Sequence, residues 1–484
     1  MKNLIKILYI LNFLLPVCTQ GQTVTWQKWY DYNNYDDQGV DIVQTFDNSY
    51  LALSNNYIIN SDKFSVLKLN AFGNIEWQKI YDDSLINHLA TGIQQTLDSN
   101  FIISGYNSSK MFLLKINKFG IPVWIKYFAK PGADVRCHSL KITIDNKIIS
   151  CGSVLYISPN KWNSYILKTD SFGNKEWDNE FSDSLFSSAS DVIETKSNRF
   201  YLSGSTVTNT FSGDYYCFVK NIDSKGKLIW NQVFGKKKYG NNIVLNSDNK
   251  LYVAGRFDSN GVSSYLSKLD TNGNIIFQKS YNQNRGIAMC STESGKLILS
   301  GASSFRLDST SSTYVIGFAK IDTNGSLIFS NQVITTFGDY YSGSSKIRQT
   351  SDNGFIIIGQ TDYPFTSNTN TLVVKSDSLG NAPKIVGVQN SNSEIPELFT
   401  LYQNYPNPFN SSTIISYKLN FPGTIKIKVI DILGKSVLEV ANGFQDVGIY
   451  LYELNLDKSS SGIYFCILMK DEIILDKKMM LLLK

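Results

Sequence analysis

One short segment recurs seven times between residues 66 and 388, and this repeat limits the possible folds more than any other feature. The copies read like KLDTNGNIIFQKSY, and each has a lysine near its start, at Lys68, Lys115, Lys168, Lys220, Lys268, Lys320 and Lys375. Successive lysines are 47 to 55 residues apart. A period near fifty residues that contains turn residues is typical of a β-propeller, in which each repeat forms a four-stranded sheet called a blade.

Two positions are nearly fixed in the copies. A glycine stands in a short turn that needs a left-handed backbone, at Gly73, Gly120, Gly173, Gly226, Gly273, Gly325 and Gly380. Four residues later comes an aromatic residue, at Trp77, Trp124, Trp177, Trp230, Phe277 and Phe329, whereas the seventh copy has Lys384. Adjacent blades need large side chains between them, so we predict that these aromatic residues pack blade on blade. Metal binding by the Asp of DTNG is an alternative, although the copies lack a ligand cluster.

A second motif lies between the copies, again seven times, with TGIQQTLDSNFIISG as one example. Each occurrence predicts a strand, a polar turn and an apolar strand, so each blade consists of two hairpins. Residues 24–30, VTWQKWY, match the last strand of a blade, with Trp26 and Tyr30 in the places of Trp77 and Tyr81. We predict that this strand completes the seventh blade and removes an open edge. The expected fold is all-β, with a seven-bladed β-propeller over residues 22–388.

The repeat resembles that of bacterial quinoprotein-like propellers, in which an Asp, a Gly and a Trp recur in each blade. The resemblance covers residues 24 to about 388 and concerns packing. The quinone-dependent dehydrogenases of that group also have a vicinal cysteine pair and calcium-binding carboxylates, and we find neither in this sequence. We therefore predict no cofactor and no metal site.

Residues 1–21 have the organisation of a signal peptide. Lys2 and Lys6 precede an apolar run at residues 7–17, which is too short to span a bilayer, and cleavage after Gly21 fits the small residues there. The alternative, in which Cys18 carries a lipid, would need a small residue before the cysteine instead of a valine. No later segment is apolar enough to cross a membrane.

The net charge and the cysteine positions bear on two questions, whether the protein binds nucleic acid and whether it forms disulfide bonds. A formal net charge of +5 over 484 residues gives no reason to expect nucleic acid as a partner. After the signal peptide, cysteines remain at Cys137, Cys151, Cys217, Cys290 and Cys466, mostly in strand-like runs, so we interpret them as small buried core residues. Cys137 and Cys151 flank one predicted hairpin and could form a single disulfide.

The repeat ends near residue 388, and a polar linker, QNSNSEIPE at residues 389–397, leads to a separate region. Residues 398–484 contain six or seven short strand-like runs, which predict a small Ig-like β-sandwich. In TIKIKVIDILGKSV, Ile425, Ile427 and Val429 alternate toward the expected core before a turn at Gly434.

The stretch YPNPFN, residues 405–410, carries the most specific signal of this region. Pro406 and Pro408 cannot donate to a sheet, so an ordered loop is expected to lead into the strand STIISYKL. With IKIKVIDILGKSV, SSGIYFCIL and the closing KKMMLLLK, it resembles the type A C-terminal sorting domain of the type IX secretion system of Bacteroidetes-type bacteria. Gln403 and Asn404 depart from the usual LYPNPFN. The matching motif residues are Tyr405, Pro406, Asn407, Pro408, Phe409, Asn410, Gly434, Gly462 and Tyr464.

The resemblance implies a route out of the cell. The signal peptide would take the chain to the periplasm, and the outer-membrane translocon would then recognise the folded domain. In the family the domain is commonly removed, and the cargo is released or linked to surface lipopolysaccharide. We therefore expect secretion or an outer-surface location, with the type IX translocon as a partner. An ordinary adhesive β-sandwich is the alternative.

We find no catalytic constellation in the repeat region. His88 and His138 both precede an innermost strand and are candidates for a site at one mouth of the channel, although ordinary loop histidines are the simpler interpretation. Asp41 and Asp191 precede the first strands of blades 1 and 4, where a carboxylate pair could serve glycoside hydrolysis. Turn or cap carboxylates are again the simpler interpretation. A secreted hydrolase or lyase is thus the alternative function.

The loops that follow the second and fourth strands of each blade vary in length, and in a propeller they emerge on the same face. The gap from Gly105 to Lys115 is 10 residues, whereas that from Gly301 to Lys320 is 19. These loops mix Tyr, Trp, Phe, Asn and Ser, which suits binding of sugars or protein surfaces. We predict a non-catalytic protein that binds an extracellular glycan or protein. A small basic loop at Lys236–Lys238 is interpreted as solvated.

Overall fold

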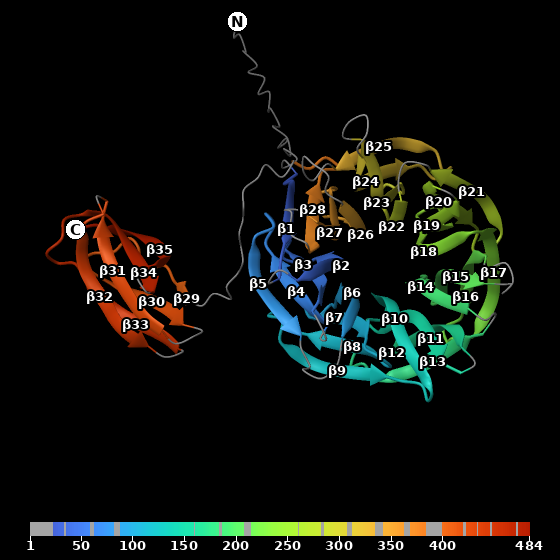
Figure 1. The fold of residues 1–484 in the computed structure, drawn as a ribbon, viewed down its shortest axis with the longest axis horizontal. Helices are drawn as coiled ribbons and strands as arrows, with labels where there is room; N and C mark the ends of the chain where they lie inside the picture. The colour runs from blue at the N-terminus through green and yellow to red at the C-terminus, as the bar shows by residue number, and fades with distance from the viewer. Residues whose placement is uncertain are drawn as a thin grey trace, which may run out of the picture. The chain divides into compact units, whose positions relative to one another are not determined.

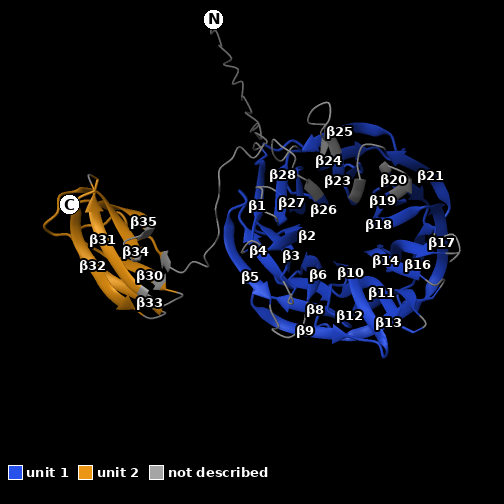
Figure 2. Cartoon of the chain, viewed as in Figure 1, with its two compact units in different colours: residues 1–388 blue, residues 389–484 orange. Residues whose placement is uncertain are grey.

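The computed structural model is built from strands, and no helix occurs among the residues that it describes, which confirms the all-β prediction. The chain divides into two compact units, residues 1–388 and residues 389–484 (Figure 2). The predicted signal peptide and linker lie outside the described residues. The structure describes residues 23–32, 35–58, 62–81, 88–158, 160–182, 186–207, 214–259, 261–281, 285–306, 312–333, 342–362, 368–383, 399–419, 423–432, 434–445, 448–470 and 473–484.

Strands of the first unit pair in chain order to form antiparallel sheets of four. The first two such sheets comprise β2 (Asp36–Gln44), β3 (Tyr50–Tyr57), β4 (Lys63–Leu69) and β5 (Ile75–Tyr81), and β6 (Leu89–Gln95), β7 (Phe101–Tyr106), β8 (Met111–Ile116) and β9 (Pro122–Phe128). Two more comprise β18 (Lys238–Leu245), β19 (Leu251–Ser259), β20 (Gly261–Leu269) and β21 (Ile275–Tyr281), and β22 (Arg285–Ser291), β23 (Leu297–Arg306), β24 (Ser312–Ile321) and β25 (Leu327–Val333).

Between these sheets, two sets of four strands are joined into one eight-stranded sheet. The first set comprises β10 (Ala133–Ile142), β11 (Ile148–Tyr156), β12 (Lys161–Thr169) and β13 (Lys175–Phe181). The second comprises β14 (Phe186–Glu194), β15 (Phe200–Val207), β16 (Tyr215–Ile222) and β17 (Leu228–Lys236). A single parallel pair, Trp162 with Phe186, makes the junction.

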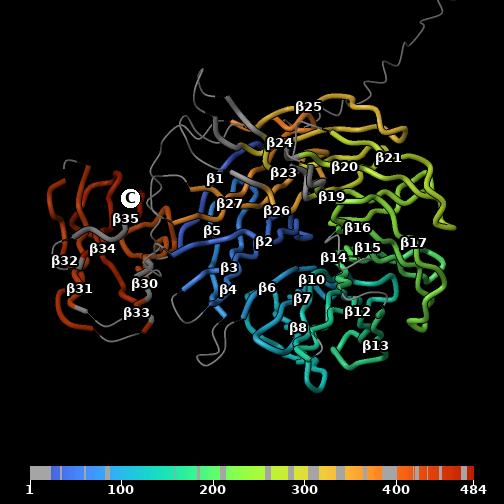
Figure 3. The backbone as a smooth tube through the Cα atoms, turned by 45° about the vertical axis from the view of Figure 1, so that its right-hand side comes forward, coloured from blue at the N-terminus to red at the C-terminus, as the bar shows by residue number. Residues whose placement is uncertain are grey.

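The last sheet of the first unit combines its two ends. It has the order β1 (Trp26–Tyr30), β28 (Asn370–Ser376), β27 (Phe355–Thr361) and β26 (Ser342–Gln349). β1 runs antiparallel to β28, with Trp26 opposite Lys375 and Tyr30 opposite Thr371, which is the N-terminal pairing predicted from the sequence. The chain path in Figure 3 shows this meeting of the blue and orange segments.

The sheets of the first unit stand side by side around a common centre (Figure 1). The innermost strands contact one another in the order β2, β6, β10, β14, β18, β22 and β26, and β26 contacts β2. Buried apolar side chains fill the space between neighbouring sheets. One such cluster includes Trp26, Ile42, Tyr50, Ile358 and Val373 and lies between the last sheet and the first. The first unit is therefore propeller-like.

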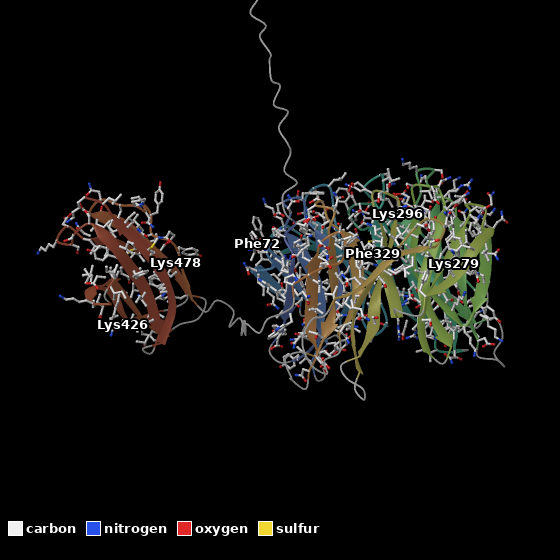
Figure 4. All side chains as sticks on the ribbon, turned by 90° about the horizontal axis from the view of Figure 1, so that it is seen from above. Phe72, Lys279, Lys296, Phe329, Lys426 and Lys478 are labelled. Atoms are coloured by element: carbon white, nitrogen blue, oxygen red, sulfur yellow. The ribbon has the colours of Figure 1, made fainter. Side chains whose placement is uncertain are left out.

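Turn glycines of one sheet meet aromatic rings of the sheet before it. Gly120 has a φ of +75°, and a Cβ atom added to it would lie 2.9 Å from the Trp77 ring. The same contact joins Trp124 to Gly173, Trp177 to Gly226, Trp230 to Gly273, Phe277 to Gly325 and, from the N-terminal strand, Trp26 to Gly73. Phe329, labelled in Figure 4, differs, because Gly380 faces Phe318 and Phe329 stacks on Phe318 with 6.0 Å between ring centroids.

The repeated lysines are largely buried, and several bind an acidic residue in the turn between the first two strands of their sheet. Lys68 is 7% exposed, and its Nζ lies 2.9 Å from Asp47 Oδ2. The Thr45 hydroxyl donates to the same carboxylate. Equivalent ion pairs are Lys115–Asp98, Lys168–Asp145, Lys268–Asp248 and Lys375–Asp352. Each pair ties the outer hairpin of a sheet to the inner hairpin.

A β-bulge interrupts each innermost strand at the same place. The register shifts between Gly39 and Asp41, Ala90 and Gly92, Cys137 and Ser139, Ala189 and Asp191, Gly240 and Asn242, Gly286 and Ala288, and Ser344 and Lys346. A bulge bends a strand and re-aims its side chains. His138 is the extra residue of the bulge in β10, and Asp41 and Asp191 follow the bulges in β2 and β14.

The second unit has two sheets that share one hydrophobic core. One sheet comprises β29 (Phe399–Leu401), β30 (Ser412–Leu419) and β33 (Gly448–Asn455), and the other β32 (Ser436–Gln445), β31 (Gly423–Asp431), β34 (Gly462–Lys470) and β35 (Ile473–Leu482). Ile425, Ile427 and Val429 are fully buried in this core, as their alternation predicts, together with Tyr417 of the first sheet. Hydrophobic burial on facing sheets is the main stabilising term for so small a unit.

Candidate functional site

The sorting motif forms a loop that is hydrogen-bonded to the last strand of the chain. Asn407 Oδ1 accepts a bond of 2.8 Å from the Leu481 amide, and Asn407 Nδ2 donates to the Met479 carbonyl at 3.2 Å. The Phe409 amide donates to the Leu481 carbonyl at 3.0 Å, and the Leu483 amide donates to the Phe409 carbonyl at 2.9 Å. Residues at the two ends of the domain therefore form one surface.

Asn404 and Thr413 hold the same loop from its inner side. Asn404 is 3% exposed, and its Nδ2 donates to the Pro406 carbonyl at 3.0 Å and to Thr413 Oγ1 at 2.9 Å. The Thr413 hydroxyl donates to the Pro406 carbonyl at 2.8 Å. Gln403 Nε2 donates to the Met479 carbonyl at 2.7 Å. Both residues that depart from the family motif thus support the loop, which the motif comparison alone did not reveal.

Phe409 and Tyr405 of the motif have opposite environments. The Phe409 side chain is 3% exposed and belongs to the domain core. The Tyr405 side chain is 80% exposed, although its backbone is fixed by two hydrogen bonds with Ile414, of 3.0 and 2.9 Å. A rigidly held, exposed aromatic residue is the kind of side chain that anchors protein interfaces. Tyr405 is therefore the motif residue best placed to contact another protein.

Gly434, Gly462 and Tyr464 serve the structure of the domain. Gly434 has a φ of +80°, and its amide donates to the Asp431 carbonyl at 3.0 Å in the turn between β31 and β32. Gly462 pairs with Leu482 of β35. The Tyr464 hydroxyl donates to the Ser460 carbonyl at 2.7 Å beneath the start of β34. These three residues shape the sheet on which the motif loop rests.

The first unit carries a line of neighbouring aromatic and arginine side chains near the ends of its strands. We call it the aromatic ladder, and its members are Tyr106, Arg136, Trp162, Phe186, Tyr215, Tyr239 and Arg256. Successive neighbours lie 5.6, 5.1, 5.6, 5.6, 4.8 and 5.1 Å apart between ring centroids or between a guanidinium carbon and a ring. Arg256 is exposed and the other members are half-buried.

The ladder runs from the sheet of β6–β9 to the sheet of β18–β21, at the strand ends from which the variable loops leave. Trp162 and Tyr215 belong to two of the aromatic-rich segments that the sequence assigned to loops, and the structure places them at the starts of β12 and β16. The contacts of the ladder across sheets had no sequence signal, because members such as Tyr106 and Arg136 are thirty positions apart and belong to no shared motif.

The two histidines face different surroundings. His88 is 4% exposed, its Nε2 lies 3.2 Å from the Tyr127 hydroxyl, and its ring stands edge-on to Phe112. His138 lies within β10 instead of preceding it, and its Nδ1 donates to the Ala189 carbonyl of β14 at 2.8 Å. Burial lowers the pKa of His138. These contacts do not bring the two rings together.

The two aspartates lie within first strands instead of preceding them, because the strands extend to both sides of the bulge. Asp41 accepts hydrogen bonds from Arg348 of β26 at 2.9 and 3.0 Å, and from the Ile93 amide of β6 at 3.1 Å. Asp41 Oδ1 also accepts from the Ile42 amide of its own strand at 2.9 Å, so Asp41 joins three sheets.

Asp191 of β14 links its strand to the first strands on both sides in the same way, to β10 and β18. It accepts hydrogen bonds from the Ser139 hydroxyl at 2.7 Å and from the Ile243 amide at 3.3 Å, and Lys141 lies 3.8 Å away. Burial would raise the pKa of Asp191, but the positive charges of Lys141 and Lys346 and these hydrogen bonds outweigh burial and lower it. An ionised, fully hydrogen-bonded carboxylate suits a structural tie and not a general acid.

Two cysteines of one sheet and the aspartate of the DTNG turn lie in the described part of the chain. Cys137 and Cys151 are free and fully buried, and burial raises the pKa of Cys137 to about 11. Among the described residues, no group of three or more His, Cys, Asp or Glu side chains is arranged to hold a metal ion. The turn carboxylate of Asp270 instead accepts the Asn272 and Asn274 amides, each at 2.9 Å.

Residues 403–481 match the family described as "Secretion system C-terminal sorting domain". The chain thus ends in a type IX secretion sorting domain, as the motif resemblance predicts, and such a domain indicates export to the cell surface or secretion. In the described residues, we find no helix with the length and apolar character needed to cross a membrane. No curated protein matches the sequence.

Several solved structures share weak similarity with the chain. A protein of unknown function from Dyadobacter fermentans is 9% identical, with 74% of this chain and 98% of that protein covered and a TM-score of 0.47. The β-propeller domain of the Trilobed protease from Pyrococcus furiosus is 10% identical, with coverage of 73% and 99% and a TM-score of 0.44. The periplasmic gluconolactonase of Pseudomonas aeruginosa is 11% identical, with coverage of 60% and 84% and a TM-score of 0.40. At these scores no activity can be transferred to this chain.

Proposed function

We propose that this protein passes through the type IX translocon and acts outside the cell as a non-catalytic binding module for a glycan or a protein. Residues 1–21 would be a signal peptide, residues 22–388 a seven-bladed β-propeller, residues 389–397 a linker and residues 398–484 an Ig-like sandwich read by the translocon. The observation that carries the proposal lies inside the region that matches the sorting family. It is the set of hydrogen bonds that Asn407 and Phe409 of the motif loop form with the end of the chain at residues 479–483, which we call the clamp.

Two features support seven blades closed into a ring. The innermost strands contact one another in sequence, and β26 contacts β2. Among the described residues, the β-pairing between β10–β13 and β14–β17 is limited to Trp162 with Phe186, so these strands count as two blades. The six aromatic residues proposed for blade packing contribute in different ways, since Phe277 meets the next turn glycine whereas Phe318 takes the place of Phe329.

We favour binding over hydrolysis because the candidate catalytic residues of the first unit form structural hydrogen bonds. Asp41 and Asp191 hold neighbouring sheets together, and His138 bonds to a backbone carbonyl. The aromatic ladder, by contrast, is half-exposed at the strand ends, where rings and adaptable polar groups make a binding surface. A hydrolase or lyase would need a reactive group that is free of such structural bonds.

Deletion of residues 398–484, followed by cell fractionation, tests the export part of the proposal. We expect the full chain outside the cell or on its surface, and the truncated chain in the periplasm. A full-length chain with Asn442→Ala, an exposed substitution on β32, is the control that shows whether any change in the domain prevents export. Arrival of the truncated chain at the surface or in the medium would contradict the proposal.

The binding part is tested separately with the full chain on a glycan array and in pull-down experiments with extracellular proteins. We expect saturable binding to at least one glycan or protein, with no turnover of the ligand. Release of a cleaved product, and loss of that release in His138→Gln or Asp191→Asn, would favour the hydrolase or lyase instead.

A further inference from the structure

The aromatic ladder lies beside basic residues of the loop at Lys236–Lys238. The Lys237 amide donates to the Tyr215 carbonyl at 2.7 Å, and Lys237 has a left-handed φ of 61° and an exposed side chain. This bond fixes Lys237 between two ladder members, because Tyr239 follows two residues later. Lys236 is engaged by Asp214 at 2.7 Å. Lys236 and Lys237 are exposed, as expected from the sequence, and the backbone bond to Tyr215 places Lys237 at the ladder.

Two arginines of the ladder have their guanidinium groups over aromatic rings. The Arg136 guanidinium lies 5.6 Å from the Tyr106 ring and 5.1 Å from the Trp162 ring, and the Arg256 guanidinium lies 5.1 Å from the Tyr239 ring. Stacking engages the face of a guanidinium and leaves the N–H groups at its edge able to form paired bonds with a carboxylate or sulfate group. The ladder thus offers cations that the protein itself holds in place.

The aromatic rings of the ladder provide apolar surfaces beside these cations. Trp162, Phe186, Tyr215 and Tyr239 are half-buried, so each is anchored by packing and keeps part of its surface in contact with solvent. Phe186 stands nearly perpendicular to Tyr215, at 85°, and Tyr215 is tilted by 33° from Tyr239. Rings held at different tilts offer a row of small apolar platforms, which fits a chain of linked sugar rings better than one compact ligand.

We propose that the aromatic ladder binds an extended anionic polysaccharide, with sugar rings on Tyr106, Trp162, Tyr215 and Tyr239 and acidic groups on Arg136, Arg256 and Lys237. This inference rests on the proposed binding function and narrows it to one class of ligand. Uronic acid and sulfate groups share the chemistry that these cations recognise. Protein partners and neutral glycans are the outcomes that would speak against it.

Native affinity electrophoresis of the full chain in gels that contain a polymer tests the proposal. Polygalacturonate supplies carboxylate groups, dextran sulfate supplies sulfate groups, and dextran is the neutral polymer. We expect retardation by at least one anionic polymer, no retardation by dextran, and weaker retardation when salt is added, because salt screens exposed charges. Retardation by polygalacturonate indicates recognition of carboxylate groups, and retardation by dextran sulfate indicates recognition of sulfate groups.

Substitutions in the ladder connect the retardation to these residues. Arg256→Gln and Tyr106→Ala are each expected to weaken binding about tenfold, in keeping with a charged hydrogen bond or a ring contact. Phe72→Ala is the control, since Phe72 is a 60% exposed aromatic residue in the turn between β4 and β5 and lies outside the ladder. Arg136→Met keeps much of the side-chain volume and covers the case in which a larger truncation fails to fold.

The possible results separate this inference from the function on which it rests. Equal retardation by dextran and the anionic polymers would overturn the anionic ligand but leave glycan binding standing. Anionic binding that survives Arg256→Gln, Tyr106→Ala and Arg136→Met would overturn the ladder as the site. No retardation by any polymer would overturn the inference, while the array and the pull-down experiments still decide whether the protein binds a ligand.

Discussion

Asn407 Oδ1 accepts a hydrogen bond of 2.8 Å from the amide of Leu481, 74 residues further along the chain. The motif that begins the sorting domain and the strand that ends it are therefore one structural element. A receptor that binds one of them meets the other, and a chain without its last strand would also lose the order of the motif loop.

Asn407→Ala removes both side-chain bonds to β35. We expect a cost of about 1–3 kcal/mol to the stability of the sorting domain, because the Leu481 amide loses its partner and the Met479 carbonyl keeps only the bond from Gln403. Hydrogen exchange of β35 in the full chain measures the effect. Asn410→Ala is the control, since the Asn410 side chain is exposed and accepts only from its neighbour Ser411. Equal protection of β35 in both variants would show that the clamp is unimportant.

Gly120→Ala tests the contact between a turn and the aromatic ring of the preceding sheet. The left-handed φ costs about 1–2 kcal/mol for any residue with a Cβ, and the 2.9 Å approach to Trp77 adds a steric cost of about 1–3 kcal/mol. Gly132→Ala isolates the first term, because Gly132 has a φ of +70° and no atom within 4 Å of its added Cβ. Urea midpoints should fall further for Gly120→Ala, and equal midpoints would argue against this packing.

Asp47→Asn removes the charge that balances the buried Lys68. Partial burial would raise the pKa of Asp47, but the hydrogen bonds from Thr45 and Lys68 outweigh it and hold the pKa below its usual range. We expect a loss of about 1 kcal/mol at pH 7, a modest value because the Asp47 side chain is 64% exposed and solvent screens the pair.

The pH dependence of this pair has a definite sign. Because the folded-state pKa of Asp47 is depressed, its contribution is complete above the unfolded pKa of about 3.9 and is lost as the pH falls below that value. The difference in urea midpoint between the wild type and Asp47→Asn should therefore shrink from pH 6 to pH 3. Ser294→Ala, at the equivalent turn position between β22 and β23, should show no such trend. A difference that stays constant with pH would contradict the ion pair.

His138 should titrate below the ordinary pKa of histidine, because burial disfavours its charged form. The folded state then prefers the neutral ring, so stability is fully present above a pH of about 6.5 and declines as the pH falls through the folded-state pKa. NMR titration of the two histidines, assigned with His138→Gln, measures this. A His138 pKa above 6.5 would contradict the buried site beside Ala189.

The periodic features of the sequence were sufficient for the propeller-like arrangement, because they act locally. A turn at Gly120 needs a left-handed backbone wherever it occurs, and Trp77 must be covered wherever a strand presents it. The N-terminal strand was recognisable for the same reason, since Trp26 and Tyr30 repeat the spacing of Trp77 and Tyr81, and the Tyr30 and Tyr81 hydroxyls both donate to turn-glycine carbonyls.

Other features depend on contacts between distant residues and had no local signal. Gly380 faces Phe318 instead of Phe329, which depends on how the sheet of β22–β25 meets the sheet of β26–β28, and both residues are aromatic in the sequence. The support of the motif loop by Asn404 could not be seen, because Asn404 looked like an insertion in the family pattern. The aromatic ladder likewise exists only once the sheets stand side by side.

The most direct test of the account transfers the export signal to another protein. Residues 1–21 are fused before a folded periplasmic carrier, and residues 389–484 after it, in a bacterium that has a type IX system. We predict that the carrier appears on the surface or in the medium, and that it stays in the periplasm when residues 398–484 are left out. A carrier that remains in the periplasm with the folded C-terminal domain attached would contradict the central claim.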